Sequence, residues 1–178
     1  KLLAEEYFGD EKSLIRVDMS EFMEKYSVSK LIWSAPGYVW YEEGGLLTEQ
    51  VRRKPYSVVL FDEIEKASPD VLNIMLQILD DGHLKDNKWR WIDFKNTVII
   101  LTSNIWSESF GKKMAKIGFA SDESQKAIDF KDFDVIKEQV IDSAKDTLPP
   151  ELINRLNGMI VFKPLSKLIL WDIFKKEL

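Results

Sequence analysis

The sequence contains no cysteine and a single histidine, His83. The lack of cysteine excludes disulfides, thiolate nucleophiles and zinc sites built on cysteine. One histidine is too few for a histidine-rich metal site, so we expect His83 to be a loop or hairpin residue. No apolar run approaches the roughly 20 residues of a membrane span, and no signal peptide is visible. These absences favour a cytoplasmic protein without a membrane partner.

Basic residues are in the minority. The 178 residues include 25 Lys and Arg against 30 Asp and Glu, which gives a formal net charge of −5. Because nucleic-acid-binding domains usually carry a basic face, this balance argues against a nucleic-acid partner. The hydrophobic share of 45% is ordinary for a globular protein, and the length suffices for one domain with a real core.

Strand and helix patterns alternate along the chain. Short apolar runs predict strands at residues 14–20, 58–61, 98–101 and 159–165. Helical spacing, with proline near the start or glycine at the end, predicts helices before Gly9 and at 21–32, 46–55, 69–81, 130–145 and 149–156. A hairpin is expected at 83–94. This order predicts an α/β fold with a central parallel sheet flanked by helices.

Polar side chains follow two of the predicted buried strands. Asp62 and Glu63 end the run "VVLFDE", and Thr102, Ser103 and Asn104 end the run "VIILTSN". In open α/β sheets, ligands bind at the carboxyl ends of strands. The first acid is suited to Mg²⁺, the second to polarising a water, and the asparagine to orienting water or a phosphate. Either group alone also fits a charged strand exit, whereas the two together favour a phosphate site.

Four stretches, taken in order, resemble one known family. They are "DMSEFMEKYSVSKLI", "PGYVWYEEGGLLTEQVRRKPYSVVLFDEIEKASPDVLNIMLQILDDG", "FKNTVIILTSN" and "PPELINRL". Together they are similar to the second, C-terminal ATPase module of the Clp/Hsp100 AAA+ unfoldases, of the Clp-peptidase-associated (ClpA/ClpC-like) type. The resemblance implies a P-loop NTPase fold. It also implies an AAA+ large α/β subdomain over residues 1–164 and the start of the helical small subdomain at 165–178.

The resemblance implies roles for four of these residues. Asp62 would hold Mg²⁺ and Glu63 would be the catalytic base, as the Walker B pair. Asn104 would be the sensor residue that positions the hydrolytic water. Arg155 would be an arginine finger that reaches the nucleotide of the neighbouring subunit. The implied cofactors are ATP and Mg²⁺, and the implied assembly is a homo-hexamer.

A loop rich in glycine and proline carries aromatic residues that neither a helix nor a strand explains. By the resemblance, Gly37, Tyr38, Val39 and Trp40 form the pore loop, and Tyr38 would press on a substrate polypeptide. The alternative is that Tyr38 packs on its own domain.

A second loop carries the tripeptide Ile117, Gly118 and Phe119 within polar surroundings. By the resemblance this tripeptide docks on the Clp peptidase ring, where a small apolar anchor is a typical hot spot. The alternative is that Ile117 and Phe119 fold back on the core.

The chain also departs from the family pattern. No G-x-x-x-x-G-K-[ST] motif occurs. We expect this P-loop to precede Lys1 and the sensor arginine of the small subdomain to follow Leu178. Residues 1–178 alone are therefore expected to bind nucleotide poorly and to be inactive.

Four tryptophans, Trp33, Trp40, Trp89 and Trp106, stand where the family usually has glycine. Tryptophan adds bulk and removes the freedom to take a positive φ. We hypothesise that a reassigned stop codon has been read as tryptophan where the cell inserts glycine. Tryptophan masses at these positions in the natural protein would contradict this hypothesis. "LPPE" also replaces the usual "FRPE" ahead of Arg155.

Three functions compete. The leading prediction is the ATP-binding subunit of a Clp protease, which threads unfolded or tagged proteins through a hexamer pore into the peptidase. A peptidase-independent Hsp100 disaggregase is the first alternative, and deletion of residues 117–119 separates the two, since only the former would lose peptidase binding. A non-hydrolysing ring scaffold is the second, against which the intact Asp62, Glu63, Asn104 and Arg155 argue.

Overall fold

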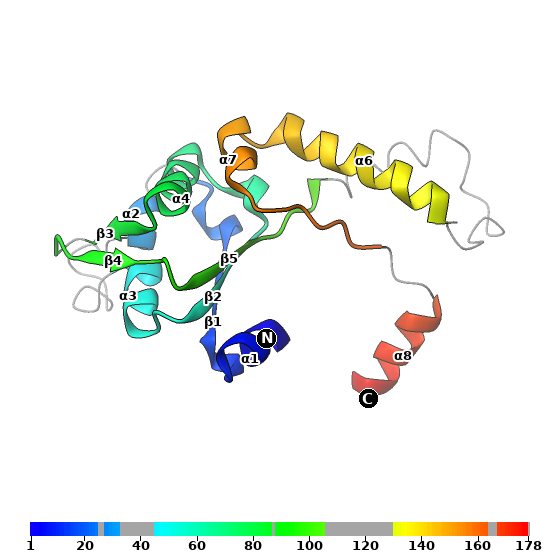
Figure 1. Cartoon of the computed structure of the whole chain (residues 1–178), viewed down its shortest axis with the longest axis horizontal. Coiled ribbons are helices and arrows are strands. Elements are labelled where there is room, and N and C mark those ends of the chain that lie inside the picture. The colour runs from blue at the N-terminus through cyan, green and yellow to red at the C-terminus, as the bar shows by residue number, and fades with distance from the viewer. Residues whose placement is uncertain (25–26, 33–44, 87, 106–129, 164–166, 178) are drawn as a thin grey trace. The chain divides into compact units, whose positions relative to one another are not determined.

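The computed structural model describes residues 1–24, 27–32, 45–86, 88–105, 130–163 and 167–177 (Figure 1). The chain forms two compact units. The first comprises Lys1–Asn104 and Glu151–Arg155, and the second comprises Ile105–Pro150 and Leu156–Leu178. The predicted subdomain boundary after residue 164 stays a prediction.

A parallel three-stranded sheet forms the centre of the first unit (Figure 1). In spatial order its strands are β1 (Leu14–Asp18), β2 (Ser57–Asp62) and β5 (Thr97–Leu101). Asp18 is in register with Asp62, and Phe61 is in register with Leu101. The carboxyl ends of all three strands therefore meet at one edge. This confirms the predicted α/β fold with a central parallel sheet.

The core is built on β1 and β2. Their buried apolar side chains are Ile15, Val17, Val58, Val59 and Phe61. The near-continuous apolar run of β2 is buried because a central parallel strand is covered on both faces. β5 was predicted to be equally buried, but its five residues are only half-buried. The reason is its place at the edge of the described sheet, with a strand partner on one side.

Helices flank this sheet. The α-helices of the first unit are α1 (Leu2–Phe8), α2 (Ser27–Ile32), α3 (Leu46–Arg53), α4 (Pro69–Asp81) and α7 (Pro150–Arg155). α1 contacts β2, and α3 contacts β1. Gly9 and Gly82 end α1 and α4 in the left-handed conformation, with φ of 73° and 70°, as predicted for glycine stops. Pro69 opens α4 after Ser68 as predicted, although the Ser68 side chain makes no capping hydrogen bond.

The predicted hairpin is confirmed. Its strands β3 (His83–Lys85) and β4 (Trp91–Asp93) pair antiparallel, with Lys85 opposite Trp91. α4 contacts β3 and α3 contacts β4, so two helices of the first unit hold the hairpin in place.

Two predicted elements are wrong. The expected helix over 21–32 is interrupted: a 3-10 turn, η2 (Met19–Phe22), precedes the shorter α2. The Phe22 carbonyl accepts the Ser68 N–H at 3.0 Å, a tertiary bond in place of a helical one. The expected strand over 159–165 is not a strand in its described part, residues 159–163. There Ile160 and Phe162 are 83% and 87% exposed, and an extended chain that buries neither side chain gains little from strand formation.

The second unit contains α6 (Phe130–Thr147) and α8 (Lys167–Glu177). The prediction of a long helix from Phe130 is confirmed, and the helix runs two residues further than expected. On α8 the Trp171 and Phe174 rings stack with centroids 5.7 Å apart. None of the helices in the described ranges is both long and apolar enough to cross a membrane.

Candidate functional site

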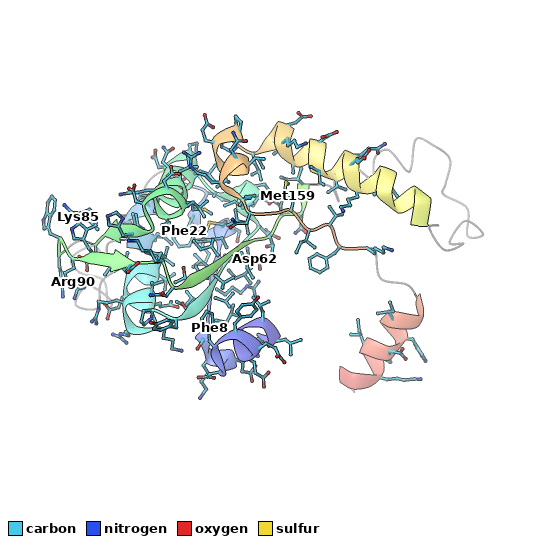
Figure 2. All side chains as sticks on the ribbon, viewed as in Figure 1. Phe8, Phe22, Asp62, Lys85, Arg90 and Met159 are labelled. Atoms are coloured by element: carbon cyan, nitrogen blue, oxygen red, sulfur yellow. The ribbon has the colours of Figure 1, made fainter. Side chains whose placement is uncertain are left out.

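Asp62 lies at the carboxyl end of β2 (Figure 2). The Thr102 hydroxyl donates to its Oδ1, and the Arg16 guanidinium donates to its Oδ2, with Nε at 3.0 Å. The Thr102 hydrogen bond, followed by that from Arg16, holds the pKa of Asp62 below its ordinary value against the opposing effect of burial. Asp62 is therefore an anion at neutral pH, held by Arg16 of β1 and by Thr102, the residue that follows β5.

Glu63 follows with an unusual backbone. Its φ of 56° lies in the left-handed region, which a side chain other than glycine enters at a cost of roughly 1–2 kcal/mol. Two hydrogen bonds fasten this turn to the residue after β5. The Glu63 N–H donates to Thr102 Oγ1 at 3.2 Å, and the Ile64 N–H donates to the Thr102 carbonyl at 2.9 Å. Strained backbone that is held in this way is typical of functional sites.

Asn104 contacts the two glutamates beyond β2. Its Nδ2 donates to Glu63 Oε1 at 3.2 Å, and its backbone N–H donates to Glu65 Oε1 at 2.9 Å. The structure thus brings Asp62 and Glu63 close to Asn104 at one edge of the sheet, although Asn104 lies about 40 positions further along the chain. The alternation of strands and helices predicted this closeness. The roles assigned to them stay predictions.

The residues present are compatible with a Mg²⁺ ion that arrives with a nucleotide. No group of three or more His, Asp or Glu in the described part of the chain is placed to hold a metal ion. Mg²⁺ seldom needs such a cage, because it keeps several waters and takes one or two carboxylates together with substrate phosphates. The anionic Asp62 meets that requirement.

Arg155, the last residue of α7, is held within its own chain. Its Nε donates to Asp80 on α4, and its Nη1 donates to the Glu151 carbonyl at 3.1 Å. The Asp80 carboxylate raises the pKa of Arg155. Among the described residues, Arg155 therefore pairs with Asp80, not with Asp62, Glu63 or Asn104.

The two predicted loop sites, Gly37–Trp40 and Ile117–Phe119, lie outside the described residues, as do Trp33 and Trp106. The ends of the first loop are described. Thr48 Oγ1 donates to the Ile32 carbonyl at 3.2 Å. A Cβ added to Gly45 would lie 2.1 Å from the Ile32 carbonyl carbon, so only glycine fits there. The chain therefore leaves α2 and enters α3 at neighbouring points.

The sequence did not identify Arg16 or Glu65 as partners of the site or Asp80 as the partner of Arg155, and it assigned no role to Thr102. Arg16 gave one signal, because it is a cation inside the otherwise apolar run of β1. Its partner Asp62 is 46 positions away, and the β1–β2 register places Arg16 opposite Leu60, two residues before Asp62, within reach of its long side chain.

With this geometry in view, comparison with known proteins defines the class. A model of the AAA domain family (Cdc48 subfamily) matches residues 1–159, and the chain belongs to this family. Its relatives show that it is a ClpA/ClpC-like AAA+ module with a P-loop NTPase fold, as predicted.

Three curated relatives illustrate the similarity. "Chaperone protein ClpC2, chloroplastic" of Oryza sativa subsp. japonica is 56% identical over 173 residues, which is 97% of this chain and 18% of the relative. The "ATP-dependent Clp protease ATP-binding subunit ClpA homolog CD4B, chloroplastic" of Solanum lycopersicum is 56% identical over 175 residues, with the same coverage. The "ATP-dependent Clp protease ATP-binding subunit ClpC" of Staphylococcus aureus (strain USA300) is 51% identical over 168 residues, 94% of this chain and 20% of the relative. The chain thus spans about a fifth of the length of these relatives.

Proposed function

We propose that the protein containing this chain is an ATP-dependent protein unfoldase, the ATP-binding subunit of a Clp protease. The observation that carries the proposal is the cluster at the carboxyl edge of the sheet, where Asn104 donates to Glu63 and the Thr102 hydroxyl donates to the adjacent Asp62. Two relatives that are 51–56% identical are named as ATP-binding subunits of Clp proteases, which supports the same activity here. Those names do not favour the disaggregase alternative.

The chemistry follows from the acids and the amide. Asp62 would hold Mg²⁺, and the ion would neutralise charge on the nucleotide phosphates. Asn104 donates to Glu63 Oε1 and so restrains the carboxylate, which leaves Oε2 to accept a proton from the attacking water. The left-handed backbone of Glu63 keeps the carboxylate beside Asn104.

The wider assembly belongs to the same proposal. Six subunits would form a ring in which Arg155 completes the neighbour's site. Residues Gly37–Trp40 would grip unfolded or tagged proteins, and Ile117–Phe119 would dock on the peptidase ring. The ends of the first of these segments, at Ile32 and Gly45, lie beside each other.

Two further points are proposed. Because residues 1–178 contain no P-loop motif, this segment alone would bind nucleotide poorly and would not hydrolyse it. The sequence favours the cytoplasm, although the rice and tomato relatives are named chloroplastic.

The test is Glu63→Gln in the full-length protein that contains this chain. Loss of the general base should lower the rate of ATP hydrolysis by about 10²–10⁴-fold and leave nucleotide binding intact. Glu21→Gln, at an exposed glutamate of η2, is the matched control and should hydrolyse ATP at the parent rate. An unchanged rate in Glu63→Gln would contradict the proposed function.

A further inference from the structure

We propose that Thr102 is the positioning residue of this site, where it orients the Asp62 carboxylate and holds Glu63 in its left-handed conformation. The inference rests on the proposed function, because it takes Asp62 and Glu63 as the groups that act in hydrolysis.

Thr102 makes hydrogen bonds to four consecutive residues. Its N–H donates to the Phe61 carbonyl at 2.9 Å, and its own carbonyl accepts the Ile64 N–H at 2.9 Å. Between these, its Oγ1 donates to Asp62 Oδ1 and accepts the Glu63 N–H at 3.2 Å. The pairing of β2 with β5 is thereby continued past the end of the sheet and into the turn that carries both acids.

The hydroxyl group is essential to this arrangement. A hydroxyl has one donor and two acceptor lone pairs, so it can bind a carboxylate and a backbone N–H at the same time. Serine keeps both bonds, whereas valine has the shape of threonine and keeps neither. The two backbone bonds of Thr102 do not depend on the side chain, so a valine would be held in the same place.

Asp62 is held from two sides by groups of different charge. Arg16 on β1 brings a positive charge to Oδ2, and Thr102 brings a neutral donor to Oδ1. A guanidinium competes with a metal cation for the carboxylate, whereas a hydroxyl orients the carboxylate without neutralising it. Without the hydroxyl, Asp62 would turn toward Arg16 and away from the β5 side of the edge, where Asn104 lies.

Glu63 depends on the same hydroxyl. Its N–H bond to Thr102 Oγ1 helps to offset the strain of a φ of 56°. When this bond is lost, the backbone can relax toward negative φ, which moves the carboxylate away from Asn104 Nδ2. A misplacement of about 1 Å at a reacting group can lower a rate by roughly 10²-fold.

The experiment compares three variants in the full-length protein. Thr102→Val should lower kcat for ATP hydrolysis by about 10–100-fold, with KM within about twofold. It should also raise, by several-fold, the Mg²⁺ concentration that half-saturates binding of a fluorescent, non-hydrolysable ATP analogue. Thr102→Ser should retain most of the parent kcat and Mg²⁺ requirement. Thr97→Val is the matched control, since Thr97 opens β5, pairs with Ser57 at the opposite end of β2 from the acids, and donates its hydroxyl to the Phe94 carbonyl at 2.7 Å.

The outcomes separate this inference from the proposed function. If Glu63→Gln abolishes hydrolysis while Thr102→Val hydrolyses like the parent, only the role of Thr102 is wrong. Equal losses in Thr102→Val and Thr97→Val would also overturn it, because the effect would then be general to the strand. If Glu63→Gln hydrolyses normally, the proposed function itself fails. Should Thr102→Val not fold, Thr102→Ala removes the same hydroxyl without a branched methyl and is judged by the same readouts.

Discussion

Two residues other than glycine have a positive φ in the described parts of the chain, Glu63 at 56° and Trp89 at 59°. Glu63 is fastened by the Thr102 hydroxyl. Trp89 lies in the turn between β3 and β4, is 79% exposed, and donates its N–H to the Asp86 carbonyl at 3.1 Å. The turn needs this backbone, whereas the exposed ring contributes little packing. Trp89 is also one of the four tryptophans that stand where the Clp/Hsp100 family usually has glycine. Its positive φ gives a physical reason for glycine at this position.

At position 89, a glycine variant should be more stable than an alanine variant, although glycine is usually the less stable of the two. Both Trp89→Gly and Trp89→Ala remove the ring and its cation–π contact with Lys85, whose Nζ is 5.4 Å from the ring centroid. Only glycine relieves the positive φ. We expect Trp89→Gly to be more stable than Trp89→Ala by about 1 kcal/mol in urea unfolding.

Trp91 supplies the control. It lies in β4 with ordinary strand pairing to Lys85, so glycine there should be less stable than alanine by roughly 0.5–1 kcal/mol. If glycine were the weaker substitution at both positions, the strain assigned to Trp89 would be wrong.

At the residue level, the sequence was informative about acids and less so about their partners. Asp62, Glu63 and Asn104 could be predicted to meet because each follows an apolar run, and parallel strands bring their carboxyl ends together. The Arg16–Asp62 and Thr102–Asp62 contacts could not, since each depends on strand register and a side-chain rotamer. The closeness of the three residues is confirmed, and their catalytic roles stay predictions.

At the level of elements, an ion network joins α3 to the β3–β4 hairpin. Glu49 on α3 accepts from Arg52 (Nη2 to Oε1, 2.6 Å) and Arg53 (Nε to Oε1, 2.8 Å). Arg90 Nη2 lies 3.7 Å from Glu49 Oε2 and also pairs with Asp86 at 2.6 Å. Figure 2 shows Arg90 and Lys85 on the β3–β4 hairpin. The network therefore ties the helix that follows the predicted pore loop to the hairpin.

Glu49 should make the stability of this region depend on pH. The Arg52 hydrogen bond, with Arg53, lowers its pKa from 4.5 to about 2 even though Glu49 is only 9% exposed. A carboxyl group with a lowered folded-state pKa adds stability above its unfolded pKa, and this is lost as pH falls through the folded value. Glu49→Gln should therefore lower the free energy of unfolding by about 2 kcal/mol at pH 7. The difference from the parent should shrink between pH 4.5 and pH 2 in urea unfolding.

The control is Glu6→Gln, the same change on the exposed face of α1. It should differ from the parent by less than about 0.5 kcal/mol at every pH. A Glu49→Gln difference that stays constant down to pH 2 would show that the ionised network adds no stability.

Element predictions succeeded where local pattern and burial agreed. The helices α1, α3 and α4 end close to the predicted positions, which are Gly9, the residues before Pro55, and Gly82. A few neighbouring residues decide the backbone conformation at each of these ends. The predictions for 21–32 and 159–163 were wrong because tertiary contacts and burial, which local pattern does not reveal, decided the outcome. The Phe22 carbonyl binds Ser68, and the apolar Ile160 and Phe162 are exposed rather than buried.

At the scale of the whole molecule, the position of Arg155 bears on assembly. Its guanidinium is bound to Asp80 and to the Glu151 carbonyl, and the two side chains of the ion pair are 36% and 44% exposed. An ion pair this exposed contributes little to stability, so it orients Arg155 without preventing its transfer to another anion. This suits a residue that completes a site on a neighbouring subunit.

Mixing subunits tests that arrangement. By the proposed roles, rings of Glu63→Gln alone would lack the base and rings of Arg155→Ala alone would lack the finger, so each should hydrolyse ATP very slowly. In a 1:1 mixed ring, a site is intact where an Arg155→Ala subunit, with its own Glu63, faces the Arg155 of a Glu63→Gln neighbour. Random mixing makes about a quarter of the sites intact, so hydrolysis should recover to about that fraction of the parent rate. The control mixes Glu63→Gln with the double variant Glu63→Gln/Arg155→Ala, in which no site has a base and no recovery is expected. If the first mixture stayed as slow as its components while the subunits still exchanged, Arg155 would act on the nucleotide of its own subunit and the proposed dependence of hydrolysis on the neighbour would be wrong.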